Sequence, residues 1–130
     1  MLTIYKYTIE GSCTEVKANV VQWLDVGWQE REGCFVAWAL VNPEGAERSF
    51  LIKLIKTGEY VSDTQLEGYR YLGSVNLDFY VSHFFVAEIN PENKEVLVDD
   101  KNFNVTWSPD HLSWLDPNVL EDFFNEKEFL

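Results

Sequence analysis

The stretch GCFVAWALVN, residues 33–42, carries no polar side chain between its first and last residues. A strand that is covered on both faces reads as a continuous apolar run, whereas a strand with one face in water alternates apolar and polar residues. We therefore predict that residues 33–42 form the central strand of a sheet, with both faces covered.

A tight turn and a second strand follow the central stretch. In NPEG, residues 42–45, proline pre-sets one backbone angle and glycine tolerates a positive φ, which is typical of a turn. The strand-like run ERSFLIKLIKTG then occupies residues 47–58. Alternate side chains of a strand point to opposite faces, so that Phe50, Ile52 and Leu54 would share one face and Leu51, Lys53 and Ile55 the other. We predict that the two strands pair as a hairpin.

Four further stretches are rich in β-branched and aromatic residues, which favours strands. They are LTIYKYTIE at residues 2–10, the run at residues 22–29, YRYLGSVNL at residues 69–77 and FYVSHFFVAEI at residues 79–89. The run at 22–29 suits either a strand or a short helix, and we favour a strand. Polar, turn-forming residues at 58–68 predict a loop, which is a common place for a site. This succession predicts an antiparallel, twisted sheet or a partly open barrel.

The last third of the chain is more acidic than the rest. Residues 1–87 hold 11 acids and 7 bases, a net charge of −4, whereas residues 88–130 hold 11 acids and 3 bases, a net charge of −8. Within the acidic part, the strand-like pieces KEVLV and NFNVTW flank an Asp-Asp turn at 99–100 and predict a hairpin.

Two helix starts are expected beyond that hairpin. Ser-Pro at 108–109 and Asp-Pro at 116–117 each place a capping oxygen before a proline at the first helical position. We therefore predict a single α+β domain over residues 1–130, in which a mainly antiparallel β core at 1–88 precedes an acidic hairpin and a C-terminal helix at 89–130.

Length and composition bound the class of protein. With 130 residues, 46% of them hydrophobic, the chain can bury a core as one domain. It has no apolar run near the roughly 18 residues that cross a bilayer, and its first residues lack the pattern of a secretion signal. We expect a protein of the cytoplasm with no membrane association, in which Cys13 and Cys34 are reduced packing residues.

The net charge of −12, from 22 acids against 10 bases, excludes ordinary nucleic-acid binding, because that requires cations against the phosphates. An acidic surface is nevertheless well suited to a protein partner that has a basic groove, since opposite charges accelerate association. Solubility alone is the equally weighted alternative.

Six short motifs together resemble a family of short, mostly phage and prophage proteins whose domain has no known function. They are IYKY at 4–7, WALVNP at 38–43, RSFLI at 48–52, TG at 57–58, YLGSV at 71–75 and HFFVAE at 83–88. The resemblance covers roughly residues 1–88, and the acidic segment after Asn90 looks like an addition to the usual length. It implies a small accessory protein of a phage or mobile element, acting in a bacterial cytoplasm, where such proteins often inhibit host machinery, including defence systems.

The sequence favours no enzyme class. The histidines are His83, in an aromatic strand, and His111, beside a tryptophan, and no Gly-x-Ser-x-Gly motif, phosphate-binding glycine loop or Cys-x-x-Cys pair is present. A lone His83 is better interpreted as a hydrogen-bonded sheet residue than as a general base. The Asp99-Asp100 pair lacks the ligand spacing of a calcium loop. We expect no catalytic residue, no metal and no cofactor.

A nucleotide pocket is one alternative. Scarce cations and aromatic faces could bind the phosphates and stack the base, as in a protein that sequesters a nucleotide signal. The candidate residues are Arg48, Lys56, Arg70, Trp28 and Tyr69, with Trp23, Trp38 and Tyr71 as further aromatic faces. The alternative interpretation is that the tryptophans are core and the arginines pair with glutamates on neighbouring strands.

The acidic C-terminal surface is the other candidate. Leu120, Phe123 and Phe124 would share one side of the last helix, where they could simply pack on the sheet. The carboxylates would then face outward and dock into a basic groove. The candidate partner-binding acids are Asp99, Asp100, Asp110, Asp116, Glu121, Asp122, Glu126 and Glu128.

We therefore expect a non-enzymatic phage-type protein that binds and inhibits a host protein with a basic surface, such as one of antiviral defence or one that acts on nucleic acid. A nucleotide-signal sponge is the first alternative, and a phage structural or assembly protein is the second. The sequence leaves open whether the chain forms a homodimer.

Overall fold

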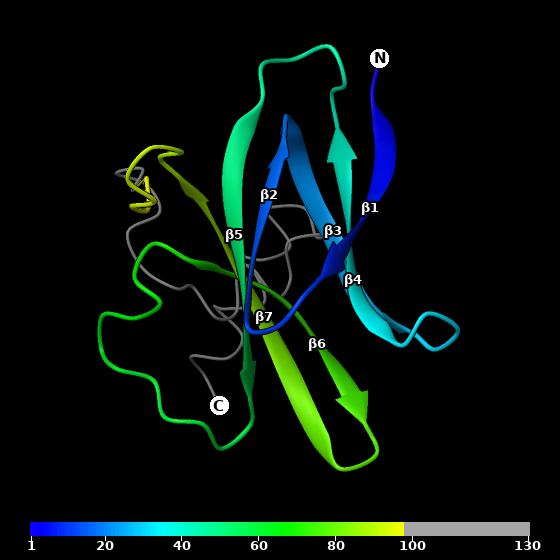
Figure 1. Ribbon diagram of the computed structural model, residues 1–130, viewed down its shortest axis with the longest axis vertical. Coiled ribbons are helices and arrows are strands. Elements are labelled where there is room, and N and C mark those ends of the chain that lie inside the picture. Colours follow the sequence, from blue (N-terminus) through cyan, green and yellow to red (C-terminus); the bar gives the residue numbers. More distant parts are fainter. Residues whose placement is uncertain (98–130) are drawn as a thin grey trace, which may run out of the picture.

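A computed structural model describes residues 1–97, which form seven β-strands in two antiparallel sheets (Figure 1). The strands are β1 (Thr3–Ile9), β2 (Cys13–Ala18), β3 (Val20–Gln29), β4 (Cys34–Val41), β5 (Arg48–Lys56), β6 (Arg70–Leu77) and β7 (Tyr80–Ile89). The three-stranded sheet has the order β1-β4-β3, and the four-stranded sheet has the order β2-β5-β7-β6. All predicted strands of the core are present, including the ambiguous one at 22–29, which begins two residues earlier, whereas β2 was not predicted.

The apolar stretch that includes β4 is the centre of its sheet, as predicted, but its outer face is only partly covered, because Trp38 and Leu40 are half-buried. β4 pairs with β1 along one edge, where Ala37 lies opposite Tyr7, and with β3 along the other, where Ala39 lies opposite Trp23. Ala37 and Ala39 are fully buried against the other sheet. The small side chains at these positions allow the two sheets to approach closely.

The predicted hairpin between β4 and β5 is wrong, because the turn between them carries the chain from one sheet to the other. Both edges of β4 are already occupied, by β1 and β3, and β5 pairs with β2 and β7 instead. Asn19, at the bend between β2 and β3, holds this connection: its carbonyl accepts from Asn42 N at 2.9 Å, and its Nδ2 donates to Ala46 O at 2.7 Å. A Cβ at Gly45 would lie only 2.5 Å from Asn19 Cγ, so the turn requires glycine there.

The main core lies between the two sheets. It contains alternate residues of the strands, as expected when each sheet buries one face. Its buried members are Ile9, Val16, Ala18, Val20, Val26, Ala37, Ala39, Val41, Phe50, Ile52, Phe84 and Val86. The alternation predicted for β5 is confirmed, because Phe50 and Ile52 are members of this core and the half-buried Leu54 packs against it.

Gly73 marks a close approach between the two sheets. β3 and β6 are in contact although they belong to different sheets, and Gly73 sits at a register irregularity of β6. A Cβ added to Gly73 would lie 3.0 Å from Val26 Cγ2. Glycine therefore permits this edge of the sandwich to close.

Replacing Gly73 with alanine should lower the free energy of unfolding by about 1–3 kcal/mol, because the new methyl group would force β3 and β6 apart and because the φ of +157° at this position is rarely adopted by L side chains. Urea unfolding monitored by tryptophan fluorescence measures this loss. The exposed neighbour Ser74 provides the control, since Ser74→Ala adds no atom between the sheets. Equal stability of the Gly73→Ala protein and the natural protein would show that the contact is not tight.

A second cluster covers the outer face of the four-stranded sheet. Leu66 and Tyr69, from the loop at 57–69, pack on Ile55 of β5 and on Phe85 and Ala87 of β7. Burial, with a smaller contribution from Cys13, raises the pKa of the Tyr69 phenol to about 12. The loop predicted at 58–68 is thus anchored to the sheet near its end.

The raised pKa of Tyr69 predicts a loss of stability at high pH. The phenol in an unfolded chain ionises near pH 10, so between about pH 10 and 12 the unfolded chain binds fewer protons than the folded one. The free energy of unfolding should be unaffected by Tyr69 below this window and should fall as the pH rises through it. Urea unfolding at about pH 9 and 11 should show a smaller decrease for Tyr69→Phe than for the natural protein, and equal decreases would contradict the assignment.

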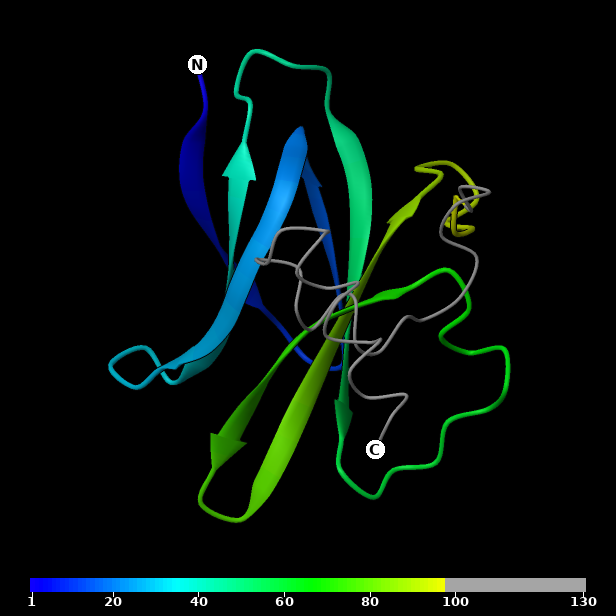
Figure 2. The ribbon, with the colours of Figure 1, turned by 180° about the vertical axis from the view of Figure 1, so that it is seen from behind.

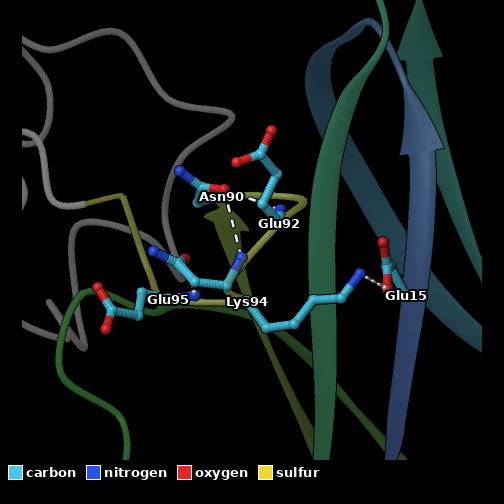
Figure 3. A network of polar contacts seen from close by, with 6 residues as sticks. Glu15, Asn90, Glu92, Lys94 and Glu95 are labelled. Atoms are coloured by element: carbon cyan, nitrogen blue, oxygen red, sulfur yellow. Dashed lines mark hydrogen bonds and ion pairs between the residues drawn. The ribbon is translucent and has the colours of Figure 1, made fainter.

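A tight turn after β7 ties the end of the sheet to β2 (Figure 3). Asn90 Oδ1 accepts from Glu92 N at 2.8 Å, and Asn90 O accepts from Lys94 N at 2.8 Å. Lys94, at a φ of 62°, extends its side chain to Glu15, where Nζ donates to Oε1 at 2.8 Å. This hydrogen bond is the largest cause of the lowered pKa of the Glu15 carboxyl. The chain then turns back beside the end of β7, where Val96 pairs with Ile89.

The predicted α+β class is wrong, since the structure is all-β over residues 1–97, with no helix in that range and no closed barrel. Helix signals were found only in the acidic segment, and the predicted helices, like the Asp-Asp turn at 99–100, lie outside the described residues. The strand patterns alone do not distinguish a single sheet or partly open barrel from two sheets. The bend at Asn19 and the β4–β5 connection divide the strands between two sheets instead.

Candidate functional site

A pocket of about 670 Å³ opens on the outer face of the four-stranded sheet. Its walls are formed by β5, β7 and the loop at 57–69. This loop leaves β5 at the end of the molecule opposite to the β4–β5 connection (Figures 1 and 2). The lining residues are Ile55, Lys56, Thr57, Gly58, Glu59, Val61, Ser62, Asp63, Leu66, Glu67, His83 and Phe85.

The floor of the pocket is apolar because of strand alternation. Ile55 and Phe85 point to the outer face of the sheet, and Leu66 of the loop packs against them. The loop leaves β5 through a turn in which Glu59 N donates to Lys56 O at 3.0 Å, and Gly58 at a φ of +96° supplies the conformation that this turn needs. Thr57 N also donates to Val81 O at 2.9 Å, which fixes the start of the loop beside β7.

His83 is a hydrogen-bonded sheet residue, as predicted. Its Nε2 lies 2.8 Å from Thr57 Oγ1, and its Nδ1 lies 3.0 Å from the Tyr71 hydroxyl. Both ring nitrogens therefore engage hydroxyl groups, which can act as donors or acceptors to suit the tautomer. The arrangement orients the ring at the edge of the pocket and links the loop to β6 and β7.

The loop gives the pocket a negative rim. Glu59, Asp63 and Glu67 are exposed and line it. Lys56 does not offset them, because its ammonium is directed to the other face of the sheet, where Nζ lies 4.6 Å from the ring centroid of Tyr80. Lys53, the other nearby cation of β5, lies over the ring of Tyr69 and donates to Gln65 O at 3.2 Å.

Large apolar side chains are exposed at this same end of the sheet. Tyr60 is 100% exposed in the loop, and Phe79 is 96% exposed at the turn between β6 and β7. Aromatic side chains are enriched in protein interfaces, so exposed ones at one end of a sheet are candidates for contact with a partner. We use the name loop face for Glu59, Tyr60, Asp63, Glu67 and Phe79.

Residues 1–95 match a protein family described as Domain of unknown function (DUF7352). The chain belongs to this family. No curated protein and no solved structure matches this chain. The DUF7352 match confirms the predicted membership of a domain family without known function and extends to residue 95, so it includes the turn that joins Lys94 to Glu15.

The DUF7352 domain does not bring the predicted nucleotide-binding residues together. Of Arg48, Lys56, Arg70, Trp28 and Tyr69, only Lys56 lines the pocket. Tyr69 is only 3% exposed and offers no free face for stacking.

The other members of that set have structural partners. Arg48 donates to Glu88 Oε1 at 3.3 Å and to the carbonyl of Val20. Trp28 packs edge-on against Phe35, with 4.9 Å between ring centroids, and Arg70 lies exposed at the start of β6.

The remaining aromatic candidates have different surroundings. Trp23 packs against Phe50 of the core, and the Trp38 ring lies over Gly27, while Tyr71 contacts His83.

The predicted partner-binding acids lie outside the described residues, and their role stays a prediction. They are Asp99, Asp100, Asp110, Asp116, Glu121, Asp122, Glu126 and Glu128. The carboxylates that line the pocket, Glu59, Asp63 and Glu67, were not among the sequence candidates. The only signal for them was the position of a polar loop beside a strand end.

The DUF7352 domain shows no sign of a metal site or a membrane-spanning helix within the described residues. Within residues 1–97, no three His, Cys, Asp or Glu side chains are grouped so that they could hold a metal ion. No helix in this range has the length and apolar character needed to cross a membrane. Cys13 and Cys34 are free thiols, and Cys13 is exposed where packing was expected.

Proposed function

We propose that the protein acts by binding a partner protein with a basic surface and thereby inhibiting it. The observation that carries this proposal is the loop face, in which three carboxylates line a pocket with an apolar floor, at the same end of the sheet as two almost fully exposed aromatic side chains. This combination supports a role in binding. Aromatic residues supply much of the affinity of protein interfaces, and rim charges steer the encounter.

The geometry of the pocket favours binding over catalysis. Its one histidine has both nitrogens hydrogen-bonded to hydroxyl groups that belong to the fold. A general base would need a nitrogen directed at a substrate proton, with a third group to orient it. The role of His83 in positioning Thr57 and Tyr71 accounts for its contacts without any reaction.

The finer form of the proposal rests on the sequence resemblance. We propose that the protein originates from a phage or prophage, works in the bacterial cytoplasm and inhibits a host protein of antiviral defence or of nucleic-acid metabolism. The residues beyond 97, with a net charge of −6 from 8 acids and 2 bases, would add to the attraction toward a basic groove that normally holds nucleic acid.

Capture of a partner from bacterial lysate tests this function. The tagged full chain should retain one or a few basic proteins at low salt and lose them at high salt, because screening weakens exposed charge pairs. Mass spectrometry of the two eluates identifies them. Recovery of no protein at low salt would contradict the proposal.

A charge-matched pair of variants separates specific binding from the general effect of net charge. Glu59→Gln/Asp63→Asn/Glu67→Gln removes three charges from the loop face and should abolish capture. Glu30→Gln/Glu44→Gln/Glu47→Gln removes three exposed charges elsewhere and should leave it intact. Equal loss in both variants would mean that the total charge alone matters.

The two alternatives have less support. A nucleotide sponge needs stacking faces and cations in one site, and Tyr69, Trp28 and Arg48 are engaged in the fold instead. It would be favoured by a nucleotide that co-purifies with the protein. A structural or assembly protein would be found in purified phage particles.

A further inference from the structure

We propose that the pocket beneath the loop at 57–69 binds a single arginine side chain of the partner protein. This inference rests on the proposed function and deepens it, because it names the chemical group that the partner inserts. Shape, polarity and charge each limit what the pocket can hold.

The shape and the floor fit a long side chain with an apolar stem. A volume of about 670 Å³ lies within the range of small-ligand sites, so it is ample for one side chain and the backbone that carries it. Ile55, Leu66 and Phe85 offer an apolar floor for a methylene chain. Arginine and lysine bury such stems against apolar surface while their charged ends reach polar groups.

The charge of the rim selects a cation. Glu59, Asp63 and Glu67 line the opening, while Lys56 and Lys53 are engaged with Tyr80 and Tyr69. A phosphate or carboxylate ligand would meet three like charges. An uncharged apolar ligand would partly desolvate these carboxylates and would offer them no hydrogen bond or opposite charge in return.

The rim favours arginine over lysine. A guanidinium is planar, is less strongly hydrated than an ammonium and forms two parallel hydrogen bonds with a carboxylate. Tyr60 follows the rim residue Glu59 in the chain and is fully exposed, so it is available to contact the guanidinium once a partner is bound. The same face would then bury the most exposed aromatic residue of the described chain.

The test uses the ¹⁵N-labelled full chain and three small probes. N-acetyl-arginine amide should shift the backbone amide signals of Gly58, Ser62 and His83, with weak, saturable binding. N-acetyl-citrulline amide has nearly the same shape without the charge, and it should bind at least about tenfold more weakly. N-acetyl-lysine amide should bind more weakly than the arginine probe.

Matched variants assign the effect to the pocket. Asp63→Asn/Glu67→Gln should weaken binding of the arginine probe at least about tenfold, whereas Glu44→Gln/Glu47→Gln should bind it like the natural protein. Equal binding of arginine and citrulline probes, or shifts confined to other parts of the chain, would overturn the proposal. Equally tight binding of the lysine and arginine probes would also overturn it, because the pocket would then attract any cation without selecting arginine.

The result is separable from that of the lysate experiment. If a basic partner is captured through the loop face and the arginine probe does not bind, the proposed function holds and the arginine pocket fails. If the arginine probe binds in the pocket and no partner is captured, the pocket is real and the proposed inhibition is wrong.

Discussion

Replacing Phe84 with alanine should lower the free energy of unfolding by about 3–5 kcal/mol, which is the largest effect that we expect from a single substitution. Phe84 is fully buried between the two sheets, and its ring meets Phe35 edge-on with 5.2 Å between centroids. The loss combines the transfer of a phenyl ring to water with the cavity that its removal leaves in a packed core. Since small domains are stable by only about 5–15 kcal/mol, much of the stability would disappear.

Phe79→Ala is the matched control, because it removes the same ring from a position that is 96% exposed. It should change the free energy of unfolding by less than about 0.5 kcal/mol. Urea unfolding followed by circular dichroism measures both variants. If Phe84→Ala does not fold, Phe84→Leu should show a smaller, measurable loss. A Phe84→Ala protein as stable as Phe79→Ala would contradict the position of this ring at the centre of the sandwich.

Tyr60→Ala should weaken binding of the captured partner by about 2 kcal/mol, which corresponds to roughly 30-fold in Kd. The side chain is fully exposed in the free chain, so it gains more burial on binding than any partly covered residue of the loop face. Interfaces concentrate their affinity in a few such aromatic residues, which are surrounded by polar groups that exclude water. Stability should be unchanged, because Tyr60 has nothing to lose on unfolding.

Surface plasmon resonance with the purified partner measures this change, and Tyr5→Ala is its control. Tyr5 is 45% exposed on β1, in the other sheet, and its removal should leave the affinity unchanged. An unchanged Kd for Tyr60→Ala, or an equal loss for both variants, would place the interface elsewhere.

Local sequence patterns predicted most of the strands, because the spacing of apolar residues along a strand reflects which of its faces are buried. The unbroken apolar run of β4 and the alternation of Phe50, Ile52 and Leu54 each follow from which faces are covered. The division of the strands between two sheets is not visible in the spacing of apolar residues. It depends on Asn19, whose hydrogen bonds reach residues 23 and 27 positions further along the chain. The sequence around a single polar residue between two strands does not indicate such distant partners.

The site was less predictable than the strands. Tyr69 and Tyr60 are both tyrosines in or next to one polar loop, yet one is anchored under the loop and the other is in solvent. The packing of Leu66 and Tyr69 on Phe85 determines which of the two tyrosines is buried. For the same reason Glu59, Asp63 and Glu67 could not be distinguished by sequence from ordinary solvated acids, whereas the cations selected for a nucleotide site proved to be engaged elsewhere.

The central claim is that the loop face meets the partner, and hydrogen–deuterium exchange of the complex tests it most directly. Backbone amides of the loop at 57–69 and of the turn at Phe79 should exchange more slowly in the complex than in the free chain. Slower exchange beyond residue 97 is compatible with the claim but does not decide it. Unchanged exchange at the loop and at Phe79, with protection confined to other strands such as β1, would contradict the account.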